Sequence, residues 1–306
     1  MAKTNSEKQE AYIITGPTSG IGYRTALELA KHGTVVLVGR NKGKLEEVQK
    51  TIEQKGGRSM AVVCDVSDIT SVRRAAVEII ALRLPIAGLL HNAGIMPQKA
   101  TKNAQGWDTT FATNHLGPFS LTEELAPRLP DGANVVFVVS AVEDPERKPA
   151  KIFGMRGGRY ISAEASARGA WQPGGSNLPG VDAYATSKQA ILASALAFAR
   201  EMPRLRFNAV EPGITPGTGL GGDANAVLRF LIGQIVLRFP PFVRYRSTPK
   251  CAARVITKIL TDGSMDTGVY YDEKGKPMLG SVLVRDLNFQ DRVVAETRAL
   301  LSTIPA

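Results

Sequence analysis

The chain has 306 residues, 43% of them hydrophobic and 22% charged, with a formal net charge of +10 at pH 7. Its two cysteines and three histidines lack metal-ligand spacing, and its dispersed basic residues match no nucleic-acid recognition motif, so we expect neither a metal site nor a nucleic-acid partner. The N-terminus lacks the apolar core of a signal peptide and no apolar run is long enough to span a bilayer, which predicts a soluble, cytoplasmic protein.

Short apolar runs alternate with helical segments along the chain, and this alternation predicts the fold class. The runs that favour strands are at residues 12–15, 34–38, 59–64, 86–90, 134–140, 205–210 and 268–272. Strands separated by helices are typical of a parallel sheet, so we expect an α/β fold with a doubly wound sheet of about seven strands and helices on both faces. Neither a linker nor a repeat divides the chain, and residues 1–306 are expected to form a single domain.

A glycine-rich turn follows the first predicted strand and precedes a helix predicted over 21–31. Glycine lets backbone N–H groups approach a phosphate closely, and the start of the following helix favours an anion. The turn therefore predicts a pyrophosphate site for a dinucleotide. An ordinary strand-to-helix connection is the alternative, because the spacing differs from the G-x-G-x-x-G fingerprint. The expected cofactor contacts here are Gly16, Thr18, Ser19, Gly20, Ile21 and Gly22.

Arg40 stands at the end of the second predicted strand, where a dinucleotide-binding fold places the adenosine ribose. An acidic residue there would bond the free 2′-hydroxyl of NAD, whereas a basic residue accommodates the 2′-phosphate of NADP. No Asp or Glu follows before Glu46, and a guanidinium binds phosphate with parallel hydrogen bonds. The position therefore predicts NADP rather than NAD, with a solvated loop arginine as the alternative.

Polar and small residues follow the third and fourth predicted strands. They are Asp65 and Val66 after the third, and Asn92, Ala93 and Gly94 after the fourth. Because strand ends line the crevice where such cofactors bind, we expect Asp65 to accept a hydrogen bond from the adenine amino group. Residues 92–94 would let the backbone pass close to a ribose. The alternative at both places is turn chemistry, with Asp or Asn capping a helix.

Tyr184 and Lys188 lie one helical turn apart in an Ala-rich stretch predicted to be a helix over 181–201. A free tyrosine has a pKa of about 10, and a nearby ammonium favours its phenolate. Tyr184 could then exchange a proton with a forming alkoxide or an alcohol, while Ser140, after the buried run 134–139, bonds the same oxygen. A surface pair is the alternative, but a lysine facing inward from an apolar helix needs a functional reason because desolvating its charge is costly.

The motifs together resemble those of the classical short-chain dehydrogenase/reductase family, from residue 12 to about residue 271. They are Thr15-Gly16-x-x-x-Gly20-x-Gly22, Asn92-Ala93-Gly94, Asn114, Ser140, Tyr184-x-x-x-Lys188 and Pro212-Gly213. Residues 114–122 and 268–271 are most similar to the retinol-dehydrogenase-like branch. The resemblance implies a Rossmann fold, contacts from Lys188 to the nicotinamide ribose and a relay water held by Asn114. It also implies cofactor contacts from Pro212, Gly213, Thr215 and Thr218, although spacing does not decide which threonine meets the carboxamide.

Two segments depart from the pattern or extend it. The interval 143–181 is longer than in typical members and is interpreted as an inserted loop that shapes substrate access, mediates subunit contact or is a mobile bystander. Residues 214–247 follow Pro212-Gly213, where the resemblance implies a lid over the substrate. The lid is apolar with interspersed arginines, which indicates a hydrophobic substrate first and contact with a membrane surface second.

These observations predict an NADP-dependent oxidoreductase that interconverts a carbonyl and an alcohol on a small hydrophobic substrate. A reductase of C=C bonds, an epimerase or a non-catalytic NADP sensor on the same fold are the alternatives. The resemblance also implies a homodimer or homotetramer.

Overall fold

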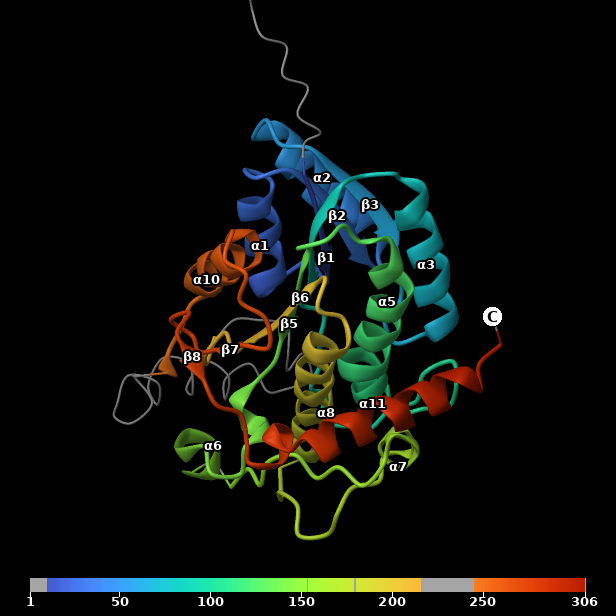
Figure 1. The fold of residues 1–306 in the computed structure, drawn as a ribbon, viewed down its shortest axis with the longest axis vertical. Helices are drawn as coiled ribbons and strands as arrows, with labels where there is room; N and C mark the ends of the chain where they lie inside the picture. The colour runs from blue at the N-terminus through green and yellow to red at the C-terminus, as the bar shows by residue number, and fades with distance from the viewer. Residues whose placement is uncertain (1–9, 153, 179, 216–244, 306) are drawn as a thin grey trace, which may run out of the picture.

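The computed structural model describes residues 10–152, 154–178, 180–215 and 245–305, and its centre is an eight-stranded sheet (Figure 1). The strand order is β3-β2-β1-β4-β5-β6-β7-β8, with β1 to β7 parallel and β8 antiparallel to β7. The strands are β1 (Ala11–Thr15), β2 (Thr34–Gly39), β3 (Ser59–Val63), β4 (Ile86–His91), β5 (Asn134–Val138), β6 (Arg206–Val210), β7 (Tyr270–Tyr271) and β8 (Pro277–Met278).

The central strands are apolar at almost every position because both faces of the sheet are covered. Successive side chains of β1 point to opposite faces: Ile13 belongs to one core cluster, and Tyr12 and Ile14 belong to the other. The two clusters lie on the two sides of the sheet, so the strands hold their register by burying both sets of alternating side chains.

Helices form a layer on each side of the sheet (Figure 1). One core cluster includes side chains of α1 (Gly20–Leu29), α2 (Lys42–Gln54) and α10 (Pro249–Thr261). The other includes side chains of α3 (Ile69–Ala81), α5 (Gly117–Leu125), α8 (Val181–Glu201) and α11 (Leu287–Ser302). The short helices are α4 (Thr109–Phe111), α6 (Lys148–Ile152) and α7 (Ala163–Arg168), and residues 112–116 form a π-helical turn before α5. Of the helices in the described ranges, none combines the length and the apolarity needed to cross a membrane.

The doubly wound α/β fold predicted from the sequence is confirmed, with differences at the sheet edge. The expected strand over 134–140 ends at residue 138, and the one over 268–272 shortens to β7. The antiparallel β8 was not expected. It forms because the chain turns back at Gly275, whose φ of +75° suits a glycine, while the N–H of Asp272 donates to the carbonyl oxygen of Lys276 over 2.8 Å.

Around Tyr160, the predicted insertion, residues 143–181, is packed against the rest of the protein. The Tyr160 phenol is 1% exposed and donates to Glu296 of α11 over 2.7 Å, and its ring meets Phe289 edge-on. On its other side the backbone N–H of Arg159 donates to the hydroxyl of Thr186 in α8. These contacts fix the middle of the segment, around Tyr160, between α8 and α11.

α11 is fixed to two helices of the same face. The Arg298 guanidinium contacts Glu123 of α5 at 2.8 Å and Glu201 of α8 at 2.6 Å. In Figure 1, α11 lies across the ends of both helices, with α7 beside it. The C-terminal helix therefore forms the support on which the insertion rests.

The strand order places the site. β1 and β4 are neighbours, although β2 and β3 lie between them in the chain, so the connections after β1 and after β4 leave in opposite directions. In doubly wound sheets ligands bind in the crevice beyond the carboxyl ends of the strands at this point.

Candidate active site

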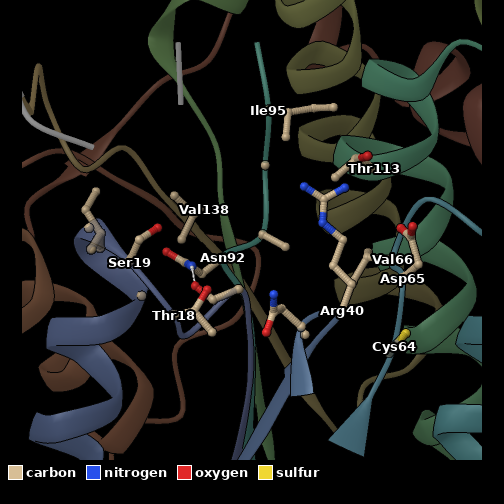
Figure 2. Close-up of a pocket in the computed structure, with 18 of the residues that line it drawn as sticks. Thr18, Ser19, Arg40, Cys64, Asp65, Val66, Asn92, Ile95, Thr113 and Val138 are labelled. Carbon is tan, nitrogen blue, oxygen red and sulfur yellow. Dashed lines mark hydrogen bonds between the residues drawn. The ribbon is translucent and has the colours of Figure 1, made fainter. Parts of the chain in front are cut away.

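A cavity of about 450 Å³ lies in this crevice, within the size range of small-molecule sites (Figure 2). The predicted cofactor contacts that line it are Gly16, Thr18, Ser19, Gly20, Ile21, Gly22, Arg40, Asp65, Val66, Asn92, Ala93, Gly94, Tyr184, Lys188 and Pro212. The lining also includes Gly39, Asn41, Lys44, Cys64, Ile95, Thr113, Val138 and Val139. Asn114, Ser140, Gly213 and Thr215 lie outside this lining, and Thr218 lies outside the described residues.

In the turn after β1, two backbone segments approach so closely that only glycine fits at position 22. Gly16 has φ of +67°, and Gly20 has φ of +55°. A Cβ at Gly22 would stand 2.1 Å from the carbonyl oxygen of Gly16, which real atoms do not tolerate. The turn thus presents bare backbone to the cavity.

Asn92 fixes the shape of this turn from the neighbouring strand. Its side-chain amide donates to the carbonyl oxygens of Thr15 at 3.0 Å and Gly16 at 3.1 Å. In return the Thr15 hydroxyl accepts the backbone N–H groups of Asn92 and Ala93, each at 3.0 Å. Asn92 thereby fixes the backbone of the turn that lines the cavity. Its partner is Thr15, which the sequence analysis named only as part of the glycine motif.

The start of α1 offers unpaired donors to an anion. Ser19 is the N-cap residue, and its side chain makes no capping hydrogen bond within the described part of the chain. The first turn of α1 contains no acidic residue. Its N–H groups and the positive end of the helix dipole therefore suit a phosphate at this position.

A second basic position lies beside Arg40. Figure 2 shows the exposed Arg40 side chain extending into the cavity toward the side where Asp65, Val66 and Thr113 lie. Lys44, one turn into α2, also lines the cavity. Asn41 caps this helix by accepting the backbone N–H of Lys44 over 3.0 Å. Sequence reasoning missed Lys44; its spacing of four residues from Arg40 was the available signal.

Asp65 lies where the adenine was expected, but one of its oxygens is engaged. Its Oδ1 accepts the backbone N–H of Ser67 at 2.9 Å and the Ser67 hydroxyl at 2.7 Å. The carboxylate therefore organises the turn after β3 as well as lining the cavity.

Tyr184 and Lys188 line the same cavity, and Ser140 lies beside Tyr184. Tyr184 is 6% exposed and shares a side-chain hydrogen bond with Ser140, which caps the short 3₁₀ helix Ala141–Glu143. Burial raises the pKa of Tyr184 to about 12; the bond with Ser140 opposes this rise, and the Glu211 charge adds to it. The lowering of this pKa expected from Lys188 is therefore not the dominant effect in the cofactor-free protein.

Lys188 is 4% exposed, and its ammonium lies 5.6 Å from the centre of the Tyr184 ring. Burial lowers the pKa of Lys188 to about 8. The Nζ atom donates to the carbonyl oxygen of Val138 over 2.8 Å, which satisfies part of its hydrogen-bonding capacity. A Cβ on Gly94 would stand 3.5 Å from this Nζ, so the absent side chain keeps the approach to the ammonium open.

The Asn114 side chain ties three segments together. Its Oδ1 accepts the N–H of Ile95 at 2.9 Å, and its amide donates to the Ile95 carbonyl at 2.9 Å and to the Ser187 hydroxyl at 3.0 Å. It lies in the π-helical turn 112–116, a geometry frequent at functional sites. The side chain thus positions the loop after β4 against α8.

The segment after β6 leads to the predicted lid. A Cβ on Gly213 would stand 2.9 Å from the Tyr245 carbonyl oxygen, and Gly213 has φ of +75°. Ile214 pairs with Arg246 in a short parallel bridge, and its N–H donates to Tyr245 over 2.8 Å. Thr215 donates its hydroxyl to the Gly213 carbonyl at 3.1 Å. The two ends of the predicted lid thus meet beside the site, while residues 216–244 lie outside the described residues.

The contacts of His91, which precedes Asn92, are those of a core residue. It is 3% exposed, stacks on Phe137 with ring centres 4.7 Å apart, and its Nε2 lies 2.8 Å from the Thr122 hydroxyl. Across the described ranges, no group of three or more His, Cys, Asp or Glu side chains is arranged to hold a metal ion.

Comparisons with known proteins give the family. The family model described as short chain dehydrogenase matches residues 10–149. Polyprenol dehydrogenase from Mus musculus is 31% identical over 244 residues, which are 74% of this chain and 67% of that protein. Retinol dehydrogenase 12 from Bos taurus is 38% identical over 124 residues, 40% of this chain and 39% of that protein. This chain also spans only 42% of the length of human polyprenol dehydrogenase, at 34% identity.

Solved structures agree with this fold. A protein from Mycobacterium paratuberculosis superposes with a TM-score of 0.71 at 26% identity, covering 96% of this chain and 94% of that one. A short chain dehydrogenase from Burkholderia cenocepacia in complex with NADP superposes with a TM-score of 0.65 at 20% identity, covering 88% and 97%. The latter likeness concerns the fold alone. With the family match and the mouse relative, these observations show that the chain belongs to the short-chain dehydrogenase/reductase family of NAD(P)-dependent oxidoreductases.

Proposed function

We propose that the protein uses NADP(H) to interconvert a carbonyl and an alcohol on a hydrophobic substrate. The observation that carries this proposal is the buried Tyr184 phenol, hydrogen-bonded to Ser140 with the Lys188 ammonium beside its ring. A phenol with a hydroxyl partner and a cation is the arrangement that acid–base chemistry on a carbonyl oxygen requires.

The residues of the cleft fit a nicotinamide dinucleotide. The turn at 16–22 and the start of α1 would hold the pyrophosphate, and Lys188 would hold the nicotinamide ribose. When bound, the cofactor supplies a hydride to the carbonyl carbon in reduction, or takes one from the alcohol carbon in oxidation. The rest of the chemistry belongs to side chains of this chain.

Tyr184 moves the proton in this scheme. In reduction its phenol donates a proton to the substrate oxygen as that oxygen gains negative charge, and in oxidation its phenolate removes the proton from the alcohol. Ser140 donates a hydrogen bond to the same oxygen and stabilises the developing charge. Lys188 adds a positive charge beside the phenol, which favours the phenolate form that reduction leaves behind.

The preference for NADP is inferred from Arg40 and Lys44. Both line the cavity at the end of β2 and the first turn of α2, whereas the acidic side chain of the described lining, Asp65, follows β3 and is engaged by Ser67. The 2′-phosphate of NADP would find two cations and a helix N-terminus there, whereas a free 2′-hydroxyl would lack a carboxylate partner.

The hydrophobic character of the substrate is inferred from the apolar composition of the predicted lid, residues 214–247. The lid and the insertion, residues 143–181, are proposed to belong to one nucleotide-binding domain and to shape access to the substrate. Two relatives carry the names polyprenol dehydrogenase and retinol dehydrogenase, and both names specify apolar alcohols. Contact of the lid with a membrane surface and assembly into a homodimer or homotetramer belong to the same proposal.

Replacing Tyr184 with Phe tests the function. We expect NADPH affinity to stay within about twofold, because the pyrophosphate and ribose contacts persist, while NADPH-dependent reduction of lipophilic ketones and aldehydes falls by about 10²-fold or more. Ser162→Ala in the insertion is the matched hydroxyl control and should keep turnover. Unchanged turnover in the Tyr184→Phe variant would remove the phenol from the mechanism, and a saturated C–C bond in the product would identify a C=C reductase instead.

A further inference from the structure

A buried ion pair lies beside the proposed catalytic groups. Glu211, directly after β6, is 8% exposed, and its Oε2 accepts a hydrogen bond of 2.9 Å from Nη2 of Arg147. The backbone N–H of Val139 donates to the Val210 carbonyl oxygen over 2.9 Å, so Glu211 lies beside the Ser140 turn, and its carboxylate faces the backbone N–H of Ala141. One carboxylate therefore joins the Ser140 turn to the insertion.

Arg147 extends this connection to the base of the predicted lid. Its guanidinium lies 4.8 Å from the centre of the Tyr245 ring. Tyr245 in turn accepts the N–H of Ile214 through its carbonyl oxygen, so the two ends of segment 214–247 meet under Arg147. The side chain of Arg147 is 24% exposed, so it faces solvent only in part.

The surroundings of Glu211 are rich in ionisable groups. These are Arg147, Asp272, Glu273, Glu143, Tyr184 and Tyr270. Burial raises the pKa of Glu211 to about 7, and Arg147 opposes this rise. The Glu211 charge acts on Tyr184 in turn, since it raises the pKa of that phenol. A carboxylate that served only to pair with Arg147 would not need to lie within reach of the reacting phenol.

Glu143 provides an instructive contrast in the same cluster. It is fully buried and accepts the backbone N–H of Ser281 at 2.8 Å and the Ser281 hydroxyl at 2.6 Å. Its bonds therefore tie the end of the Ser140 turn to the C-terminal segment, whereas the carboxylate of Glu211 joins that turn to Arg147 of the insertion. Glu143 is not among the groups that shift the pKa of Tyr184.

We propose that Glu211 and Arg147 are positioning residues for the carbonyl–alcohol reaction, which hold the Ser140 turn against Tyr184 and tie it to the insertion. The charge of Glu211 also favours the protonated form of Tyr184, which delivers a proton to a carbonyl oxygen as hydride reaches the carbon. Carbonyl reduction is accordingly the direction that this pair promotes. The inference rests on the proposed function.

The pH profile of NADPH-dependent carbonyl reduction tests the pair. We expect Glu211→Gln to lower kcat about tenfold, because the Ser140 turn loses its anchor, with KM for the carbonyl nearly unchanged. The alkaline limb of kcat/KM should move to lower pH by about one unit, because a phenol without a nearby negative charge loses its proton more readily. Glu211→Asp retains the charge and should leave the limb in place. Glu143→Gln, the buried control, should do so as well.

A second measurement reads the phenol without turnover. The protein is labelled with ¹³Cζ-tyrosine and loaded with NADP⁺, and the Tyr184 signal is assigned by its loss in Tyr184→Phe. In Glu211→Gln this signal should titrate at lower pH than in the wild type, while NADPH affinity, which reports folding, stays within about twofold.

The two measurements separate the possible failures. An unmoved limb together with an unmoved titration overturns the role of Glu211. Wild-type protein that binds NADP⁺ but reduces no carbonyl overturns the proposed function, and the catalytic role of the pair with it, whatever the titration shows. If Glu211→Gln does not fold, an unchanged kcat in Arg147→Lys and Glu211→Asp would equally contradict the positioning role, because both variants disturb the geometry of the pair.

Discussion

Removing the Arg40 guanidinium should weaken NADPH binding and leave NADH binding almost unchanged. Arg40 lines the cavity, but its side chain is exposed, so water and salt screen its attraction for a phosphate. A hydrogen bond to a charged group contributes about 1.5–3 kcal/mol, and exposure favours the lower end. We therefore expect Arg40→Ala to raise the Kd for NADPH by roughly tenfold. Adding Lys44→Ala should raise it further.

Isothermal titration with NADPH and with NADH at low and at high salt measures this effect. Lys42→Ala is the matched control: its side chain is 77% exposed, it pairs with Glu46 at 4.0 Å, and it is not among the residues that line the cavity. The loss in Arg40→Ala should shrink at high salt, because the Debye length falls as ionic strength rises.

Two results would refute this reasoning. Equal losses of NADPH affinity in Arg40→Ala and Lys42→Ala would mean that the net charge of +10, and not the position of Arg40, attracts the cofactor. Equal losses for NADPH and NADH in Arg40→Ala would mean that the guanidinium contacts a part common to both cofactors, and the inferred preference for NADP would then lose its basis.

Three further outcomes can be measured. Gly22→Ala should abolish binding of either cofactor in the same titrations, because its Cβ would stand 2.1 Å from a carbonyl oxygen of the turn. Tyr160→Phe should lower the free energy of unfolding by about 1 kcal/mol in urea, because Glu296 loses its buried phenol partner; no change would mean that water replaces the bond. Burial lowers the pKa of His91 and of His115 to about 3, so the unfolded chain takes up two more protons than the native one below pH 6.5. Their contribution to stability is therefore complete above pH 6.5 and should fall by about 2.7 kcal/mol per pH unit in acid. Glu143 and Glu211, whose pKa burial raises to about 7, act in the opposite sense between pH 7 and 4.5, so the effect is measured as the difference in urea unfolding between the wild type and the double variant His91→Gln/His115→Gln. A difference that is independent of pH between 6 and 4.5 would contradict it.

The sequence predicted the parts of the fold that depend on local pattern. The strands β1, β2, β4, β5 and β6 are buried at every position or at all but one. α8 covers residues 181–201 as expected, because an Ala-rich stretch favours a helix and its small side chains pack closely. The edge strands β7 and β8 have two residues each, too few for a periodic signal. The ends of β5 and β7 differ from expectation because pairing, not hydrophobicity, determines where a strand ends.

The site divides in the same way. Motif spacing was sufficient to place Tyr184, Lys188 and the glycine turn in the lining of one cavity. It was insufficient for contacts between distant segments. Glu211 and Arg147 are 64 residues apart, and neither lies in a recognisable motif. Arg147 lies in the insertion, so its pairing with Glu211 depends on the path of that segment. The path is determined by the packing of the segment on α8 and α11, which the sequence does not show.

The attachment of the insertion to α11 has a consequence for how such a chain can be altered. The cofactor side of the cleft is built mainly from the first four strands and their connections, whereas segment 143–181 rests through Tyr160 on Glu296, close to the C-terminus. If the insertion alone were exchanged, the replacement would lack a matching contact surface on α11. A chimera that transfers the insertion together with α11 would carry both halves of the contact, and selectivity for substrates could then be exchanged between relatives without rebuilding the nucleotide cleft.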